Sequence, residues 1–523
     1  MNLTTGKWIP VVWANGEAGK VSLLDVFQQG DEIRDLSVRP HERIALMRLL
    51  ICVAQAALDG PKDREEWKRC KPRLPEAATT YLKKWEHAFE LFGDGQRFLQ
   101  VEGVVSTKPG IDEEPPLVSK MDTALATGNA STLFDNAGGS ERSFERSQLA
   151  LMLLTYQCFG PGGLLSECLW GGVRTKKAGN VAAPCLAGKM VHTFLLDRES
   201  LWTSVWMNLL QKDRIQIEQS WGVPVWEMMP GKPSDMGAIE NASRTYLGRL
   251  VPLCRVIRLL EDGRSMIWGS SFSYPNYADT QWRDPAATIF VRKSKDDELV
   301  RTQLAGDVRK ALWRELHAIS VIRKADTNGL GGPMALLNAV EMGSVDIVVG
   351  AVVHEPMKTT NTVDVIESVL HIPNGLFGES GQTLYSKGVA FAESWGRRLQ
   401  MAVSNCHRAM HDDLERAEFR KRGNLVKQKS ASHYWTAIEQ QVPLLLALVE
   451  NPAPLRPDGA TRDQWGCTAW GIALARAARE AYEIACPHGT PRQMKAYTLG
   501  FSVLSRFVES NVKEEDSINE EEA

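Results

Sequence analysis

The pattern of hydrophobic and polar positions changes about two thirds of the way along the chain. Up to residue 375, short apolar runs alternate with loops rich in glycine and proline. The N-terminal segment predicts two strands that lead into a helix, with a turn at Asn15-Gly16. Apolar residues at helical spacing occupy 40–58 and 144–158, and strand-like runs occupy 251–260, 265–274 and 287–293. Residues 1–375 are therefore predicted to form an irregular mixed α/β domain.

After residue 375 the pattern becomes helical. The first segment, 383–412, places Trp395, Leu399, Val403, Cys406 and Met410 on one stripe. The second, 431–450, contains Pro443, which is expected to kink it. A third runs over 461–484, and a fourth opens with Thr490 as N-cap and Pro491 at the first helical position. Antiparallel helices with short connections predict a four-helix bundle over 376–511, and the whole chain is expected to be an α+β protein.

Length and composition fit this division. The chain has 523 residues, of which 43% are hydrophobic and 24% charged, which is ordinary for a globular protein and too long for a single core. It contains no run of eighteen apolar residues and no signal-peptide pattern. We therefore expect a soluble cytoplasmic protein that is not associated with a membrane.

The cysteines argue against a disulfide framework and a zinc site. Nine cysteines are scattered without a C-x-x-C pair, so buried reduced thiols are expected. No bound metal and no cofactor are predicted.

Charge is distributed unevenly. The net charge is −3, which argues against a strongly basic nucleic-acid binder. Residues 512–523 alone carry six acidic residues and one lysine, and such a tail is usually solvated disorder. The rest of the chain is close to neutral, so nucleic-acid binding through local patches is permitted.

Several segments resemble one protein family in the right order along nearly the whole chain. They are MNLTTGKWIPV at the N-terminus, STLFDN (131–136), FGPGG (159–163), APCLAGKMVHTFLLDRESLWTSVWMNLL (183–210), PVWE (224–227), YLGRLVPLCRVIRL (246–259) and HYW (433–435). Together they resemble the CasA family, the large subunits of the type I-E CRISPR surveillance complex called Cascade. The specificity lies in their collinearity, because no single motif is decisive.

The resemblance implies a non-catalytic subunit of a crRNA-guided antiviral complex. Such a subunit recognises the PAM, a short motif in target double-stranded DNA, and promotes strand separation and R-loop formation. It also helps to recruit a helicase–nuclease. The implied partners are the other Cascade subunits, crRNA, target DNA and that helicase–nuclease, and pairing with the guide RNA reads the remaining sequence.

The resemblance also implies DNA contacts on loops. Phe134 and Asn136 match a loop beside the PAM, although an ordinary surface loop is the alternative. Gly160, Gly162 and Gly163 match a loop whose backbone reaches the minor groove, where side chains would block the approach; a simple turn would look the same. Lys293 and Lys295 lie where the family places a PAM-region lysine, with a solvated hairpin end as the alternative.

A strand-separating wedge is implied for HEPMKTTNTVD (354–364). Lys358, Thr359, Thr360 and Asn361 would form the tip of a hairpin inserted under the PAM, where unstacking a base step costs a few kcal/mol. Family members often carry glutamine at this tip, and this chain does not.

A basic run connects the first two predicted bundle helices. It could follow a phosphate backbone, or it could be a solvated linker. Its members are Arg416, Arg420, Lys421, Arg422, Lys427 and Lys429.

The best enzyme alternative is a metal-dependent phosphohydrolase. His407 and His411 are four residues apart on a predicted helix, and Asp412 and Asp413 follow. This spacing places two imidazoles on one face. However, the sequence lacks the glutamate of an H-E-x-x-H motif, a P-loop and a nucleophile elbow, so no catalysis is expected.

Overall fold

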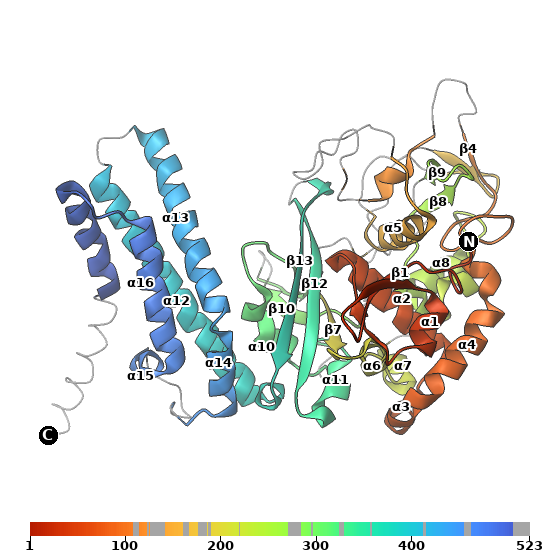
Figure 1. Ribbon diagram of the computed structural model, residues 1–523, viewed down its shortest axis with the longest axis horizontal. Helices are drawn as coiled ribbons and strands as arrows, with labels where there is room; N and C mark the ends of the chain where they lie inside the picture. Colours follow the sequence, from red (N-terminus) through yellow and green to blue (C-terminus); the bar gives the residue numbers. More distant parts are fainter. Residues whose placement is uncertain are drawn as a thin grey trace. The chain divides into compact units, whose positions relative to one another are not determined.

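A computed structural model describes most of the chain and divides it into two compact units (Figure 1). The N-terminal unit contains residues 1–312 and 322–372, and the helical unit contains residues 313–321 and 373–523. The described residues are 1–107, 115–122, 125, 142–160, 167–175, 186, 190–218, 220–269, 284–293, 297–323, 329–355, 358–411, 415–453, 455 and 462–505, and only the backbone is described at 216–218, 354–355, 358–363 and 462–463.

The strands of the N-terminal unit form small, separate sheets. Their orders are β2–β1–β3, β4–β5–β6, β8–β9, β10–β11 and β13–β12–β7, and the neighbouring strands are antiparallel. The strands are β1 Ile9–Trp13, β2 Ala18–Val21, β3 Ile33–Leu36, β4 Val104–Ser106, β5 Cys168–Trp170, β6 Val173–Arg174, β7 His192–Leu196, β8 Val256–Leu259, β9 Met266–Gly269, β10 Ile289–Lys293, β11 Leu299–Gln303, β12 Val345–Glu355 and β13 Lys358–Ile372.

Helix α2 is the central helix of this unit. Pro40 starts it at a position where no N–H is needed, and Glu42 accepts a hydrogen bond from the Arg39 N–H at 2.9 Å. Its residues are buried on nearly every side, as expected for a core helix. The helices are α1 Leu23–Gln28, α2 Pro40–Leu58, α3 Arg64–Cys70, α4 Leu74–Lys84, α5 Arg146–Phe159, α6 Leu201–Met207, α7 Lys212–Glu218, α8 Met236–Arg244, α9 Tyr246–Leu250 and α11 Leu336–Ala339.

The helical unit is built on long helices that pack side by side. Helices α12, α13 and α16 contact one another, and the Tyr482 ring on α16 packs at a tilt against Tyr497 and Phe501 of the helical residues 491–505. The short segment Trp313–Val321 belongs to this unit, with Trp313 packed against Trp435 and Trp470. The helices are α10 Leu316–Ile319, α12 Glu379–Met410, α13 Arg416–Glu439, α14 Val442–Glu450, α15 Arg462–Cys467 and α16 Ala469–Ala485.

The predicted α+β class, with a mixed N-terminal part and a C-terminal helical region, is confirmed. The N-terminal hairpin has the expected turn, with Gly16 in the left-handed region at φ +89°. The expected Thr490 N-cap is also present, because its hydroxyl accepts from the Gln493 N–H at 3.3 Å. None of the cysteines in the described part of the chain forms a disulfide, and Cys467 is the exposed one among them.

Some predicted elements are wrong in their details. Only Val256–Leu259 of the run 251–260 is a strand, since Pro252 has no N–H for a ladder. Pro443 does not kink a helix but lies in the first turn of α14, after α13 has ended. The third helical segment is divided at Thr468, whose hydroxyl caps α16 by accepting from the Gly471 N–H at 3.0 Å.

Candidate nucleic-acid interface

The β12–β13 hairpin is the longest strand pair in the described structure (Figure 1). Its two strands pair in regular register from Val345 opposite Ile372 to Val353 opposite Asp364. β12 also pairs with β7 from Asp346 to Gly350, so the base of the hairpin is part of a three-stranded sheet. The hairpin thus combines a fixed base with a distal two-stranded end.

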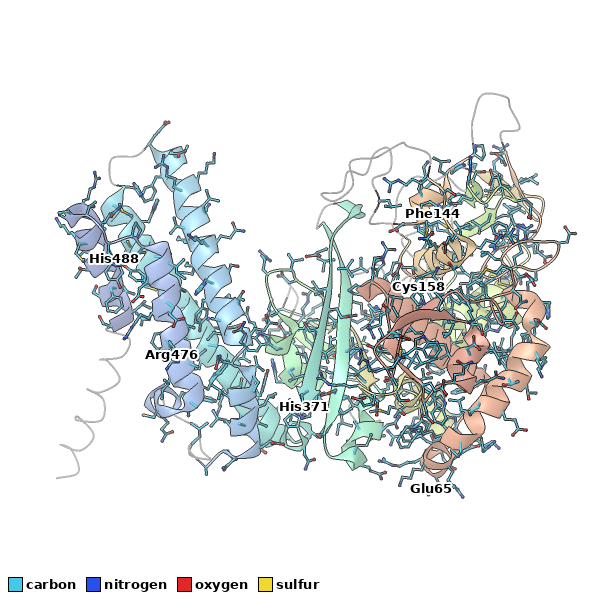
Figure 2. The ribbon with its side chains drawn as sticks, in the orientation of Figure 1. Glu65, Phe144, Cys158, His371, Arg476 and His488 are labelled. Atoms are coloured by element: carbon cyan, nitrogen blue, oxygen red, sulfur yellow. The ribbon has the colours of Figure 1, made fainter. Side chains whose placement is uncertain are left out.

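Ion pairs on one face of the hairpin hold this base. Asp346 on β12 contacts Arg198 and accepts a hydrogen bond from His371 Nδ1 at 2.8 Å (His371 is labelled in Figure 2). Burial would raise the pKa of Asp346, but its contacts with Arg198 and His371 lower the pKa below its usual value. On β13, Glu367 contacts Arg43 of α2 at 3.2 Å. The hairpin is therefore tied to the central helix.

The distal end of the hairpin carries the predicted wedge residues. Lys358, Thr359, Thr360 and Asn361 are the first residues of β13, at the distal end of the hairpin, and their role as a wedge stays a prediction. Glu355 pairs with Lys358, and His354 pairs with Thr362, so β13 has three residues between these pairs where β12 has none. Such an irregularity bends the strand and increases its local twist.

Gly160 ends helix α5 and is buried. A Cβ atom here would lie 2.9 Å from the Tyr156 carbonyl oxygen and 3.1 Å from Cys254 Sγ. The Cys254 thiol donates to the Gly160 carbonyl at 3.5 Å. Close packing against Tyr156 and Cys254 thus gives a structural reason for glycine at this position. The DNA contact expected of Gly160 stays a prediction.

Lys293 lies at the end of the β10–β11 ribbon. Its ammonium is 3.1 Å from the Asp297 carboxylate, and both side chains are mostly exposed. An exposed pair of this kind contributes little stability, so a phosphate could replace the aspartate as partner. Lys293 faces Leu299 and Val291 faces Arg301 across the ribbon, so Lys293 and Arg301 project from the same side.

Arg301 and Arg292 were not predicted as site residues. Arg292 is exposed on the opposite side of the ribbon from Lys293, opposite Val300. The available signal was the presence of three cations in IFVRK and LVRTQ. Adjacent residues of a strand point to opposite faces, so the pairing was needed to show which cations share a side.

A buried ion pair fixes the segment that leads into β10. Arg48 on α2 is within 3.0 Å of Asp284, and it donates to the carbonyl oxygens of Leu250 and Arg249 at 2.8 and 3.0 Å. Arg323 donates to the Asp284 and Gly332 carbonyls nearby. Burial would raise the pKa of Asp284, but the Arg48 charge holds it at about 2. The ribbon therefore starts from a rigid interior.

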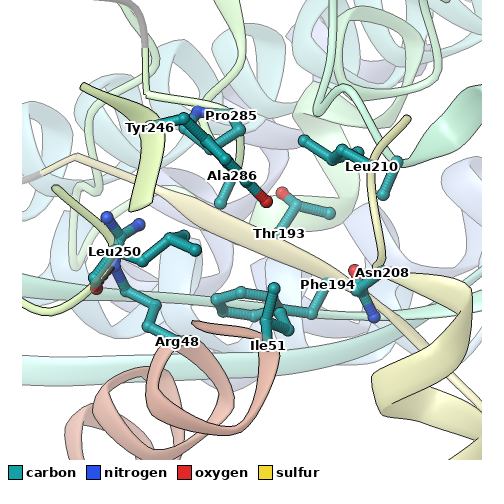
Figure 3. A pocket seen from close by; sticks show the side chains of 11 residues that line it. Arg48, Ile51, Thr193, Phe194, Asn208, Leu210, Tyr246, Leu250, Pro285 and Ala286 are labelled. Carbon is teal, nitrogen blue, oxygen red and sulfur yellow. Dashed lines mark hydrogen bonds between the residues drawn. The ribbon is translucent and has the colours of Figure 1, made fainter. Parts of the chain in front are cut away.

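The space beside this ion pair is small. Arg48, Thr193, Tyr246 and Asn208 line a cavity of about 20 Å³ (Figure 3), which is room for one water molecule and not for a substrate. Neighbouring His192 is fully buried, and burial lowers its pKa to about 3, so its ring is neutral at physiological pH. This cavity belongs to the packing of the core.

The remaining predicted contacts cannot be placed. They lie outside the described residues: Phe134, Asn136, Gly162, Gly163 and Lys295. They stay predictions.

The basic run is not a linker. Its residues lie on helix α13, and all except Lys427, which is half-buried, are exposed. Glu418 pairs with Arg422 at 2.7 Å. Gly423 allows α13 to approach α12, since a Cβ there would be 3.0 Å from the His407 ring. The helix was missed because its first half is almost entirely polar on the outside.

The histidines of the hydrolase alternative have structural contacts. His407 is buried, its Nε2 lies 3.0 Å from the Phe419 carbonyl oxygen, and its ring packs 4.6 Å from the Phe419 ring. Asp412 and Asp413 lie outside the described residues. In the part of the chain that is described, no three His, Cys, Asp or Glu side chains gather as a metal site would require. None of the described helices is long and apolar enough to cross a bilayer.

Comparison with known proteins gives consistent matches. The family model of CRISPR-associated protein Cse1 matches residues 2–481. A curated relative from Thermus thermophilus, named CRISPR-associated protein CasA/Cse1, is 26% identical over 92% of this chain and 91% of its own length. Its organism's CasA (Cse1) structure superposes with a TM-score of 0.72 at 22% identity, covering 98% of this chain and 99% of that one.

A further structural match is a chain of a structure named CRISPR RNA-guided surveillance complex. It superposes with a TM-score of 0.68 at 16% identity and covers 96% of this chain and 99% of the other. These structural likenesses establish the fold, and the family model extends over nearly the whole sequence. The chain belongs to the CRISPR-associated protein Cse1 family.

Proposed function

We propose that this chain is the non-catalytic subunit of a type I-E surveillance complex that recognises the PAM in target double-stranded DNA and starts strand separation. In this role it promotes R-loop formation and helps to recruit the helicase–nuclease. Its partners are the other Cascade subunits and crRNA. The family membership supports the complex, and the name of the matched surveillance-complex structure agrees with it.

The observation that carries the proposal is the β12–β13 hairpin. A wedge has to resist the force of the closing duplex, so it needs a base that does not move. Pairing with β7 and the Arg43–Glu367 and Asp346–His371 contacts supply such a base. The irregular register at Lys358–Asn361 bends the end of the hairpin, and a bent two-stranded end suits insertion beside the PAM.

The β10–β11 ribbon supports a separate role in reading the duplex. Lys293 and Arg301 project from one side of this ribbon, and their charges suit the negative potential of a minor groove. Thus, PAM reading and strand separation are assigned to different elements, which can be tested independently.

The test compares two targets in a complex assembled with crRNA. K358A/N361A should slow R-loop formation about tenfold on a fully paired target, the effect of losing about 1.4 kcal/mol from the transition state. The same variant should be near wild type on a target already melted beside the PAM, because unstacking is no longer required. K83A, which removes one exposed lysine from α4, is the control and should act like wild type on both targets.

K293A/R301A provides the contrast. If the ribbon reads the duplex PAM, this variant should weaken binding to paired and melted targets alike, provided that the PAM remains double-stranded. Equal defects of K358A/N361A on both targets would assign ordinary DNA binding, and not strand separation, to the hairpin end.

A further inference from the structure

The first half of α13 is a strongly basic surface. We define the basic surface of α13 as Arg416, Arg420, Lys421, Arg422, Lys427 and Lys429, which stand against a single carboxylate on this stretch, Glu418. Within the described residues, Arg422 is the one of these six with an ion-pair partner, at 2.7 Å. Like charges crowded on one helix repel one another, so this surface favours an anionic partner.

The apolar residue within this surface narrows the kind of partner. Leu425 is 59% exposed and lies between the cations at 420–422 and those at 427 and 429. An exposed leucine adds nothing to the binding of a bare phosphate chain. It suits an anionic peptide that has an apolar residue between its charges.

The chain itself contains such a peptide. The tail 512–523 carries acidic residues at 514–516 and 520–522, with Ile518 between these two groups. Its six carboxylates and one lysine give it a charge of the same size as that of residues 416–429, with the opposite sign. The Cse1 family match ends at residue 481, so the tail lies beyond the part that the family model covers.

The tail can reach this surface from where the described chain ends. A Cβ on Gly500 would lie 2.6 Å from the Ala402 carbonyl oxygen and 2.9 Å from Cys406 Cβ, so residues 491–505 pack on this part of α12. Gln400 of α12 donates to the Lys427 carbonyl at 3.1 Å. Residues 491–505 and the basic surface thus both lie beside the same part of α12, residues 400–406. The residues after Ser505 can span about 60 Å when extended.

We propose that the acidic tail 512–523 docks on the basic surface of α13 and competes there with polyanions such as DNA. A polyanion must displace the tail before it can use this surface, so weak nonspecific contacts are suppressed. A tethered segment has an effective concentration in the millimolar range, so a tail affinity of about 0.1 mM lowers polyanion affinity about tenfold. The inference does not depend on PAM recognition, because it concerns contacts within one chain.

Docking can be measured directly in the full chain without DNA. A zero-length carbodiimide reagent should join Lys421 or Lys429 to the carboxylates at 514–516 or 520–522 in low salt, as mass spectrometry of the linked peptides would show. Salt near 1 M should abolish these links, since it shortens the electrostatic screening length to about 3 Å. Lys387, an exposed residue of α12, is the internal control and should not be linked to the tail. Links found only between isotopically labelled and unlabelled chains, or no links at low salt, would overturn the proposal.

Competition is measured with a random-sequence 30-base-pair duplex that carries no PAM. The tail variant E514Q/E515Q/D516N should bind it several-fold more tightly than wild type. The matched variant E439Q/E480Q/E483Q removes the same charge from exposed positions of α13 and α16 and should change affinity less than twofold. In the background R420Q/K421Q/K429Q the tail substitutions should have no effect. The proposal would be overturned if both variants that lack three carboxylates gained the same DNA affinity, or if the tail substitutions still raised DNA affinity in that background. Net charge alone would then be responsible.

Discussion

The two units bury polar groups in different ways. In the N-terminal unit, long side chains from the core donate to backbone carbonyls of irregular segments. Arg97 donates to Leu259 O at 2.9 Å, Gln157 to Leu99 O and Arg255 O, and Arg48 to Leu250 O. In the helical unit, the buried hydroxyls and indoles bond to carbonyls near or within long helices, as Tyr434 does to Ala392 O at 2.8 Å.

This difference follows from how each backbone is satisfied. A long helix pairs its own N–H and C=O groups, so its core needs only apolar and aromatic side chains. Short strands and turns leave carbonyls unpaired, and a buried carbonyl without a donor is costly. The N-terminal unit therefore places arginines inside, whereas α13 carries its cations on the surface, where partners can meet them.

The largest expected effect tests the buried ion pair. R48M should destabilise the N-terminal unit by about 3–5 kcal/mol, because Asp284 would remain buried without its counter-charge. Urea unfolding of the full chain, followed by hydrogen exchange of peptides from each unit, would measure this loss. Peptides from 379–410 should keep their wild-type protection.

The double variant R48M/D284L separates charge from hydrogen bonding. It removes the uncompensated carboxylate but leaves the Leu250 and Arg249 carbonyls without their donor. Stability should therefore return only in part. Full recovery of the free energy of unfolding would mean that the hydrogen bonds from Arg48 to the Leu250 and Arg249 carbonyls contribute little. The explanation given for the buried arginines of the N-terminal unit would then be wrong.

A smaller effect is expected from pH. Burial lowers the pKa of His192 to about 3, compared with an ordinary value of 6.5, so the unfolded chain binds a proton at pH 5 that the folded chain does not. The free energy of unfolding is therefore unaffected by this histidine above pH 6.5, and it decreases as the pH falls from 6.5 toward 3. Between pH 7 and pH 5 the loss should be about 2 kcal/mol. H192Q, which stays neutral, should show a pH dependence smaller by this amount in urea unfolding.

Sequence patterns predicted the periodic elements well. The stretch 40–58 is α2 and 144–158 is close to α5, because an apolar stripe at helical spacing can be read locally. The turn at Asn15-Gly16 was equally local. The basic half of α13 was missed, since its outward side chains give no apolar period and its contact with α12 is made through Gly423.

Contacts between distant parts of the chain could not be predicted. Nothing local to Arg48 indicates that its partner is Asp284, and nothing in Trp313–Val321 indicates that it packs with the helices beyond residue 373. For the site, the resemblance nominated the β12–β13 region. The register that puts Lys358–Asn361 after the connection depends on pairing between strands, which single residues do not reveal.

The smallest effect provides the most direct comparison, because the same atom is removed in both units. Y434F deletes a hydroxyl whose acceptor, the Ala392 carbonyl, already accepts within the α12 ladder, so it should cost about 1 kcal/mol or less. Y81F deletes a hydroxyl that donates to Glu227 at 2.5 Å and accepts from the Trp226 indole at 2.8 Å. Trp226 is buried, so its N–H would be left without an acceptor, and the cost should be about 2 kcal/mol. Urea unfolding of both variants at pH 7 measures the difference. Equal costs would mean that a carbonyl inside a helix needs a side-chain donor as much as polar groups in irregular segments need their partners. The regularity of the helices would then not explain the apolar core of the helical unit.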